Sequence, residues 1–220
     1  MGHHAHSRLT SYVKIPGASL APILDALTSA ELLARIQDPI RDNRPTYHPA
    51  DPLIRFHYAL IRKHQSRLAR HGVDTPALWK HLSTTFASQV LGPCFEDVAR
   101  YWTAHFAHVD TLGGSPDHVG PTTLVQAEGA QRQVDVVVAA DDASAPSGRT
   151  VLALGEAKAG ETVGLHHLER LEAARSSLGR RADRARLLLF GVKHAPELVA
   201  AARARGDVEL IDLERLYGGE

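Results

Sequence analysis

The chain has 220 residues, of which 44% are hydrophobic and 23% charged, and its formal net charge is zero. This composition excludes a disordered chain and is typical of a globular protein with one or two domains. No apolar run reaches the ~20 residues of a membrane span, and the single cysteine, Cys94, excludes internal disulfides and multi-cysteine zinc sites. We therefore expect a cytoplasmic protein with no membrane partner.

Charge is distributed unevenly between the two parts of the chain. Residues 1–88 carry 11 Lys and Arg against 6 Asp and Glu, whereas residues 89–220 carry 14 against 19. A basic first part indicates either a surface for an acidic partner or a solvated surface of uneven charge. The composition leaves both interpretations open.

Residues 1–50 predict a helix followed by a short hairpin. Residues 1–7 contain three histidines and resemble a purification tag, so they are excluded from the fold prediction. Leucines and isoleucines recur at helical spacing over 18–36, and residues 37–48 favour two short strands around Asp42-Asn43. A helix before a basic hairpin is typical of the end of a winged helix, and too few residues precede it for the whole module.

The predicted partial winged helix has two interpretations. Arg35, Arg41 and Arg44 can reach the phosphates of a nucleic acid from such a hairpin. Alternatively, the segment only packs against the rest of the chain.

Residues 51–88 predict a helical linker of two helices. Asp51-Pro52 is a helix start signal, and Gly72 ends the first helix. The second helix is expected from Thr75-Pro76 to Ser88. The first helix is basic, as solvated helix faces often are.

Residues 89–220 alternate between helices and strands. Apolar periodicity and turn residues predict helices at 91–108, 162–178 and 195–205, and strands at 119–127, 132–139, 150–158, 186–192 and 208–213. The strand at 186–192 lacks alternation, as expected of a strand that is buried on both faces. The order predicts an α/β domain, in which a mixed sheet is flanked by helices.

Three charged residues interrupt the apolar strands of this domain. Asp135 lies among valines, and Glu156 and Lys158 share one face of the following strand because residues i and i+2 point the same way. If the two strands form a hairpin, Asp135 lies beside Glu156. Two neighbouring carboxylates indicate either a hard divalent cation between them or structural ion pairs with Lys158 or an arginine.

These residues, in this order, resemble a known superfamily. Asp135 followed by Glu156-Ala157-Lys158, on successive strands after a helix, is similar to the PD-(D/E)XK nucleases. More narrowly, the chain from about residue 8 to 215 resembles the C-terminal half of archaeal-type AAA ATPases. The blocks that carry this resemblance are 47–56, 92–96, 133–137 and 155–158.

The resemblance implies a restriction-endonuclease-like fold for residues 89–220 and hydrolysis of DNA with Mg²⁺ or Mn²⁺. Asp135 and Glu156 match the metal-binding acids, Lys158 matches the catalytic lysine, and Glu96 matches an accessory acid. The alternative interpretation of Glu96 is a structural one, an i,i+4 ion pair with Arg100 on the same helix.

One departure separates the chain from these ATPases. No Gly-x-x-x-x-Gly-Lys-Ser/Thr phosphate-binding loop occurs in it, so ATP hydrolysis by this chain is not expected. Three interpretations are open: the chain is a fragment, a shortened relative, or a domain that meets an ATPase in trans. The alternatives to a nuclease are therefore a DNA-binding module without catalysis and a module that docks an ATPase.

Two further features stay open. Arg170, Arg180 and Arg181 belong to a local basic run that either contacts DNA phosphates or is a solvated loop. His166 and His167 begin the helix after the Glu-x-Lys strand, and surface histidines are the favoured interpretation over a place in the site.

Overall fold

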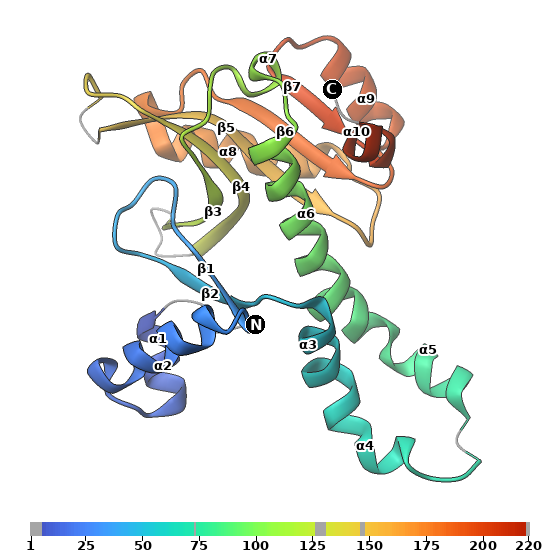
Figure 1. The fold of residues 1–220 in the computed structure, drawn as a ribbon. Coiled ribbons are helices and arrows are strands. Elements are labelled where there is room, and N and C mark those ends of the chain that lie inside the picture. Colours follow the sequence, from blue (N-terminus) through green and yellow to red (C-terminus); the bar gives the residue numbers. More distant parts are fainter. Residues whose placement is uncertain (1–5, 73, 126–130, 146–147, 219–220) are drawn as a thin grey trace. The chain divides into compact units, whose positions relative to one another are not determined.

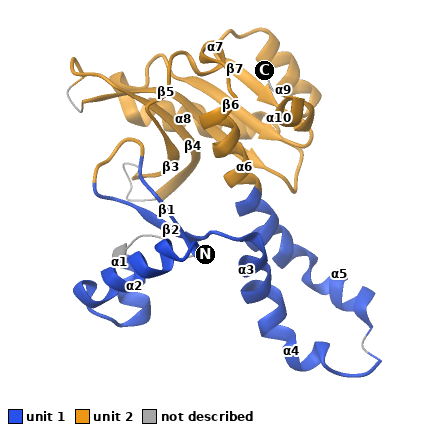
Figure 2. Cartoon of the chain, viewed as in Figure 1, with its two compact units in different colours: residues 1–38, 43–94 blue, residues 39–42, 95–220 orange. Residues whose placement is uncertain are grey.

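The computed structural model describes residues 6–72, 74–125, 131–145 and 148–218 (Figure 1). Of the tag-like segment 1–7, residues 1–5 lie outside the described residues. The chain divides into two compact units (Figure 2): unit 1 contains residues 1–38 and 43–94, and unit 2 contains residues 39–42 and 95–220. None of the described helices is both long and apolar enough to cross a membrane.

Unit 1 begins with helices α1 (His6–Val13) and α2 (Gly17–Ser29), followed by the antiparallel strands β1 (Leu33–Ile36) and β2 (Thr46–Pro49). The predicted helix 18–36 was therefore wrong in its last part. The chain turns at Glu31, whose φ is 57°, and a non-glycine residue at positive φ interrupts a helix. Leu33 then pairs with Pro49 and packs against the α2 residues Leu20 and Leu24.

Two helical segments follow in unit 1, and the second of them continues past Cys94 into unit 2. Helices α3 (Pro52–Phe56) and α4 (Arg62–Leu68) are joined by a π-helical turn, and α5 (Thr75–Phe86) continues through a second π-helical turn, Ala87–Leu91, into α6 (Gly92–His105). The Asp51 and Asp74 side chains cap α3 and α5 by accepting backbone N–H groups. The predicted break after Ser88 is wrong, and the wider turn accommodates Pro93, which lacks an N–H and crowds the preceding turn of a regular α-helix.

Unit 2 contains a mixed five-stranded sheet with the order β3-β4-β5-β6-β7. Strands β3, β4 and β5 are antiparallel neighbours, and β6 and β7 add to β5 in parallel. This confirms the predicted mixed sheet flanked by helices. The strands are β3 (His118–Val125), β4 (Gln131–Asp141), β5 (Arg149–Lys158), β6 (Arg186–Gly191) and β7 (Val208–Ile211).

Helices cover both faces of this sheet. Helices α8 (Leu165–Leu178) and α9 (Pro196–Arg203) bury Leu171 and Leu198 against one face, and α6 and α10 (Leu213–Gly218) bury Trp102 and Leu216 against the other. Figure 1 shows the sheet between these layers. Strand β6 is apolar without alternation because both of its faces are buried, as predicted. The short helices α7 (Val109–Leu112) and α10 were not predicted.

Residues 39–42 pack with unit 2, although they lie early in the chain. Ile40 is part of its core, and its carbonyl accepts a hydrogen bond from Arg181 Nη2 at 2.9 Å. Arg149 binds the carbonyl of Pro39 and forms an ion pair with Asp42. Four residues from the first quarter of the chain are thus part of the second unit.

The centre of the sheet is tightly packed next to the candidate site. Gly155 on β5 pairs with Val136 on β4, and a Cβ at position 155 would lie 3.0 Å from the Val136 Cβ and 3.1 Å from the Phe190 ring. Glycine therefore lets three strands approach closely. This close packing fixes the position of the next residue, Glu156, opposite Asp135 on the neighbouring strand.

Candidate active site

Strands β4 and β5 bring the two predicted acids together. Since Val136 pairs with Gly155, Asp135 and Glu156 lie one step further along the same antiparallel ladder and share a face. Both side chains are less than a tenth exposed. Asp135 Oδ2 accepts the backbone N–H of Ala157 at 3.1 Å, which ties the carboxylate of one strand to the backbone of the other.

Lys158 lies between the two acids. Its Nζ is 3.0 Å from Glu156 Oε1 and 3.5 Å from Asp135 Oδ2. Burial lowers the pKa of Lys158, but the charges of Asp135 and Glu156 outweigh burial, so its pKa lies above the ordinary value. The two acids therefore favour the protonated form of Lys158.

Glu96 reaches the same site from α6. Its Oε2 is 3.5 Å from Gln133 Nε2, which is also 3.4 Å from Asp135 Oδ1. Burial, followed by the charge of Asp135, raises the pKa of Glu96 to about 7. Burial likewise raises the pKa of Asp135 above its ordinary value. Glu96 and Asp135 thus lie where the charged form of a carboxyl group is disfavoured.

Arg100 fixes α6 against β4. Its Nη1 donates to the backbone carbonyl of Asp135 at 2.8 Å, and its Nη2 binds Asp97 Oδ1 at 2.5 Å. The predicted i,i+4 contact with Glu96 is present but longer, at 3.8 Å. The main role of Arg100 is therefore to position the Asp135 backbone. The sequence indicated only its four-residue spacing from Glu96, not its contact with Asp135.

A polar cavity of about 430 Å³ opens beside the acids. It is lined by two acids, two glutamines and two arginines: Glu96, Gln131, Arg132, Gln133, Asp135 and Arg170. Gln131 and Gln133 precede Asp135 at two-residue spacing, so strand alternation places them on its face. Arg132 breaks that rule and could not be placed from the sequence.

The six arginines predicted to bind nucleic acid are distributed over both units. Arg35 and Arg44 belong to unit 1, and Arg41, in unit 2, donates to the carbonyl of Thr123 at 2.8 Å. Arg180 is exposed, whereas Arg181 holds Ile40. Of the six, Arg170 lines the cavity, and its Nη1 is 3.1 Å from Glu156 Oε1.

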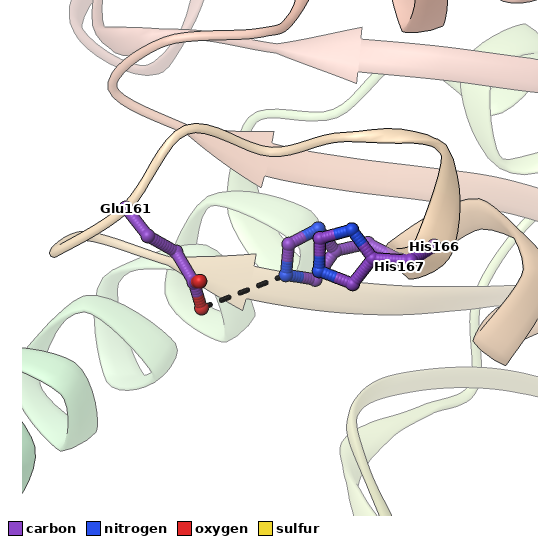
Figure 3. Close-up of side chains that lie close together, drawn as sticks. All are labelled: Glu161, His166 and His167. Atoms are coloured by element: carbon purple, nitrogen blue, oxygen red, sulfur yellow. Dashed lines mark ion pairs between the residues drawn. The ribbon is translucent and has the colours of Figure 1, made fainter.

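A second cluster lies at the start of α8, where Glu161, His166 and His167 place one possible ligand atom each within 4.8 Å of the others (Figure 3). His167 is buried, and its Nδ1 accepts the backbone N–H of Gly164 at 3.1 Å. A neutral ring therefore carries its proton on Nε2, which faces Glu161 at 3.6 Å. A protonated Nε2 cannot bind a metal ion, so His167 is best explained as a helix cap.

The acid site, in contrast, suits a hard divalent cation. Asp135 and Glu156 offer oxygen ligands, which Mg²⁺ and Mn²⁺ prefer. Glu156 Oε1 has Lys158 and Arg170 at ion-pair distance, but among the described residues neither cation makes a well-aligned hydrogen bond to this buried atom. The oxygen donors of Asp135 and Glu156 are therefore of the kind that a hard divalent cation prefers.

Comparisons with known proteins add no family to this description. Neither the family models, nor the curated proteins, nor the solved structures give a match to this chain.

Proposed function

We propose that this chain is a divalent-metal-dependent nuclease that hydrolyses DNA phosphodiester bonds. One observation carries the proposal: Lys158 Nζ lies 3.0 Å from Glu156 and 3.5 Å from Asp135, both acids are buried, and Asp135 lines an open polar cavity. We further propose that unit 2 has a restriction-endonuclease-like fold, and that residues 1–50 form part of a winged helix, as the resemblance to archaeal-type ATPases implies.

The residues have distinct roles in this proposal. Asp135 and Glu156 would hold Mg²⁺ or Mn²⁺, with Glu96 as a supporting acid. A bound divalent ion supplies Lewis-acid stabilisation of the charge on a phosphate under attack. Hydrolysis joins a water oxygen to phosphorus and breaks one P–O ester bond. Lys158, which stays protonated, offers N–H donors to the phosphate oxygens or to the attacking water.

A specific observation favours the alternative of a module without catalysis. Lys158 and Arg170 already neutralise Glu156 without a metal ion, at 3.0 and 3.1 Å. Such an ion-pair network can be structural. In that case the protein would bind DNA or dock an ATPase through its basic residues, and a metal ion would have no effect on it.

DNA cleavage decides between these functions. Supercoiled, linear and single-stranded DNA are incubated with the protein and Mg²⁺ or Mn²⁺, beside Glu156→Ala and Lys158→Ala. The charge-matched controls are Glu169→Ala and Lys193→Ala, at exposed positions. We expect metal-dependent cleavage that both site variants lose, by roughly 100-fold or more, and both controls retain.

Two outcomes would reject the proposal. If folded wild-type protein cleaves none of these substrates and no metal ion raises its melting temperature, the module without catalysis is correct. If cleavage survives in both site variants, the activity does not come from these residues.

A further inference from the structure

Arg170 has an unusual position for a residue that is expected to bind DNA. It lies on α8, its side chain is 45% exposed, and it lines the cavity together with Glu96 and Asp135. Its guanidinium nevertheless points to a buried acid, because Nη1 is 3.1 Å from Glu156 Oε1. Arg170 therefore connects the surface of the cavity with the predicted metal ligand.

Two cations share this one carboxylate oxygen. Lys158 Nζ lies 3.0 Å from Glu156 Oε1, and Arg170 Nη1 lies 3.1 Å from it. Lys158 has a second acid, Asp135, at 3.5 Å. Within the described residues, Glu156 is the acid that Arg170 meets at ion-pair distance. If a third cation binds Glu156, Lys158 can stay with Asp135, whereas Arg170 loses its partner.

A divalent ion and Arg170 would compete for this oxygen, which already has Lys158 beside it. A metal–carboxylate bond is about 2–2.5 Å long, so an ion on Oε1 would stand within a few ångström of the guanidinium. Arginine is charged at every relevant pH, so it cannot avoid this repulsion by losing a proton. The exposed side chain can instead rotate away from the acid, toward the opening of the cavity.

We propose that Arg170 occupies the cation position at Glu156 in the metal-free protein, and that metal binding releases it to hold a phosphate of the substrate. A guanidinium matches a phosphate through two parallel N–H donors. The acids would then bind the metal while the released arginine binds the substrate phosphate, so that substrate binds tightly only after the metal. This inference rests on the proposed nuclease function and adds an order of binding to it.

Arg132 provides the matched comparison within the same cavity. It also lines the cavity, but its Nη1 donates to the backbone carbonyl of Arg170 at 3.1 Å. Removing Arg132 therefore removes a nearby positive charge without freeing Glu156. Arg184, which is exposed in the turn before β6, is the charge-matched control outside the cavity.

Mn²⁺ affinity tests the competition directly. The full chain is titrated with Mn²⁺ in the absence of DNA, as wild type, Arg170→Ala, Arg170→Gln, Arg132→Ala and Arg184→Ala. We expect both Arg170 variants to bind Mn²⁺ about 3- to 10-fold more tightly than wild type. Arg184→Ala should not change the affinity, and Arg132→Ala should increase it less than either Arg170 variant. Equal increases in Arg132→Ala and Arg170→Ala, or no increase in Arg170→Ala, would overturn the inference.

DNA binding tests the second half of the inference. The retention of a short DNA duplex is measured with and without Mn²⁺ at several salt concentrations. In wild type, Mn²⁺ should strengthen retention. In Arg170→Ala, the Mn²⁺-loaded protein should bind about 10-fold more weakly, with a salt slope lower by about 1, as expected for the loss of one phosphate contact. Equal retention by wild type and Arg170→Ala would overturn this half.

The two proposals fail in different ways. If wild type cleaves DNA with Mn²⁺ but the Arg170 variants match it in metal affinity and DNA retention, the inference alone is wrong. If wild type and all variants bind no Mn²⁺, both proposals are wrong. If only the Arg170 variants bind Mn²⁺ and none cleaves DNA, the competition is correct and the nuclease function is not.

Discussion

Unit 2 contains two clusters of acids and basic side chains that differ in one physical respect. In the first, formed by Glu96, Asp135, Glu156 and Lys158, burial raises the pKa values of Glu96 and Asp135. In the second, Asp207 accepts two hydrogen bonds from Arg205 at 2.9 Å and one from Arg175 at 2.6 Å. These hydrogen bonds, those of Arg205 above all, hold the pKa of Asp207 well below its usual range.

The comparison separates a structural ion pair from a candidate site. The Asp207 side chain is about a third exposed. Three hydrogen bonds from guanidinium groups already stabilise its negative charge. For Glu96 and Asp135 in the first cluster, burial outweighs the nearby positive charges, so that their pKa values are raised. Acids in this condition favour a further cation, which is why perturbed pKa values gather at functional sites.

The largest expected difference between the clusters is their response to a metal ion. Mn²⁺ at 100 times its dissociation constant should stabilise the wild-type protein by about 2.7 kcal/mol. Asp135→Asn should lose this stabilisation, whereas Asp207→Asn should keep it. Thermal unfolding with Mn²⁺ and with a chelator measures the effect, and equal shifts in both variants would place the ion elsewhere.

The pH dependence of metal-free stability should come next in size. The pKa of Glu96 is about 7 in the folded protein against an ordinary 4.5, so the folded state binds more protons between these values. The free energy of unfolding therefore falls as the pH rises from about 4.5 to 7. In Glu96→Gln this slope should be weaker, which leaves the variant more stable than wild type above pH 7 by on the order of 2 kcal/mol.

Urea unfolding with a chelator from pH 5 to 8 checks this slope. The charges that face Glu96 come from Asp135, Arg100, Lys158 and Asp97. Asp135 also has a raised pKa, so part of the slope should remain in Glu96→Gln. A slope identical to that of wild type would show that Glu96 is not the group that titrates.

The Asp207 cluster should show the opposite sign and a smaller effect. Its carboxylate stabilises the folded protein above its ordinary pKa of 3.8, and this contribution is lost as the pH falls below that value. Asp207→Asn should cost roughly 1 kcal/mol at pH 7, because the side chain is about a third exposed and solvent screens the pair. Urea unfolding at pH 7 measures it, and a stabilised variant would contradict the structural role.

Local patterns predicted much of unit 2. The strand predicted at 186–192 lacks alternation and is buried on both faces, and the strands predicted at 132–139 and 150–158 pair as a hairpin. The two-residue spacing of Glu156 and Lys158 placed both on one face, and the hairpin placed Asp135 beside them. Each of these inferences depends on the two-residue period of a strand or on the pairing of strands adjacent in the sequence. Both can be recognised in a single sequence.

Contacts between distant segments could not be predicted. Residues 33–36 continue a helical pattern, but pairing with Thr46–Pro49 outweighs it. The hydrogen bond from Arg100 to the carbonyl of Asp135 spans 35 residues and involves no side chain of the acceptor. The contact of Arg170 with Glu156 depends on where the loop between β5 and α8 places the helix. The sequence contains no pattern that predicts the conformation of this loop.

The segment 39–42 makes part of unit 1 an insertion in unit 2. Residues 43–94 leave unit 2 after Asp42 and return to it at Phe95, so both ends of this stretch are anchored in the same folded body. If the chain were cleaved within residues 43–94, residues 39–42 would keep their hydrogen bonds to unit 2, because Arg149 and Arg181 bind the carbonyls of Pro39 and Ile40. Conversely, a chain that starts at residue 89 lacks Ile40 and leaves a gap in the core of unit 2.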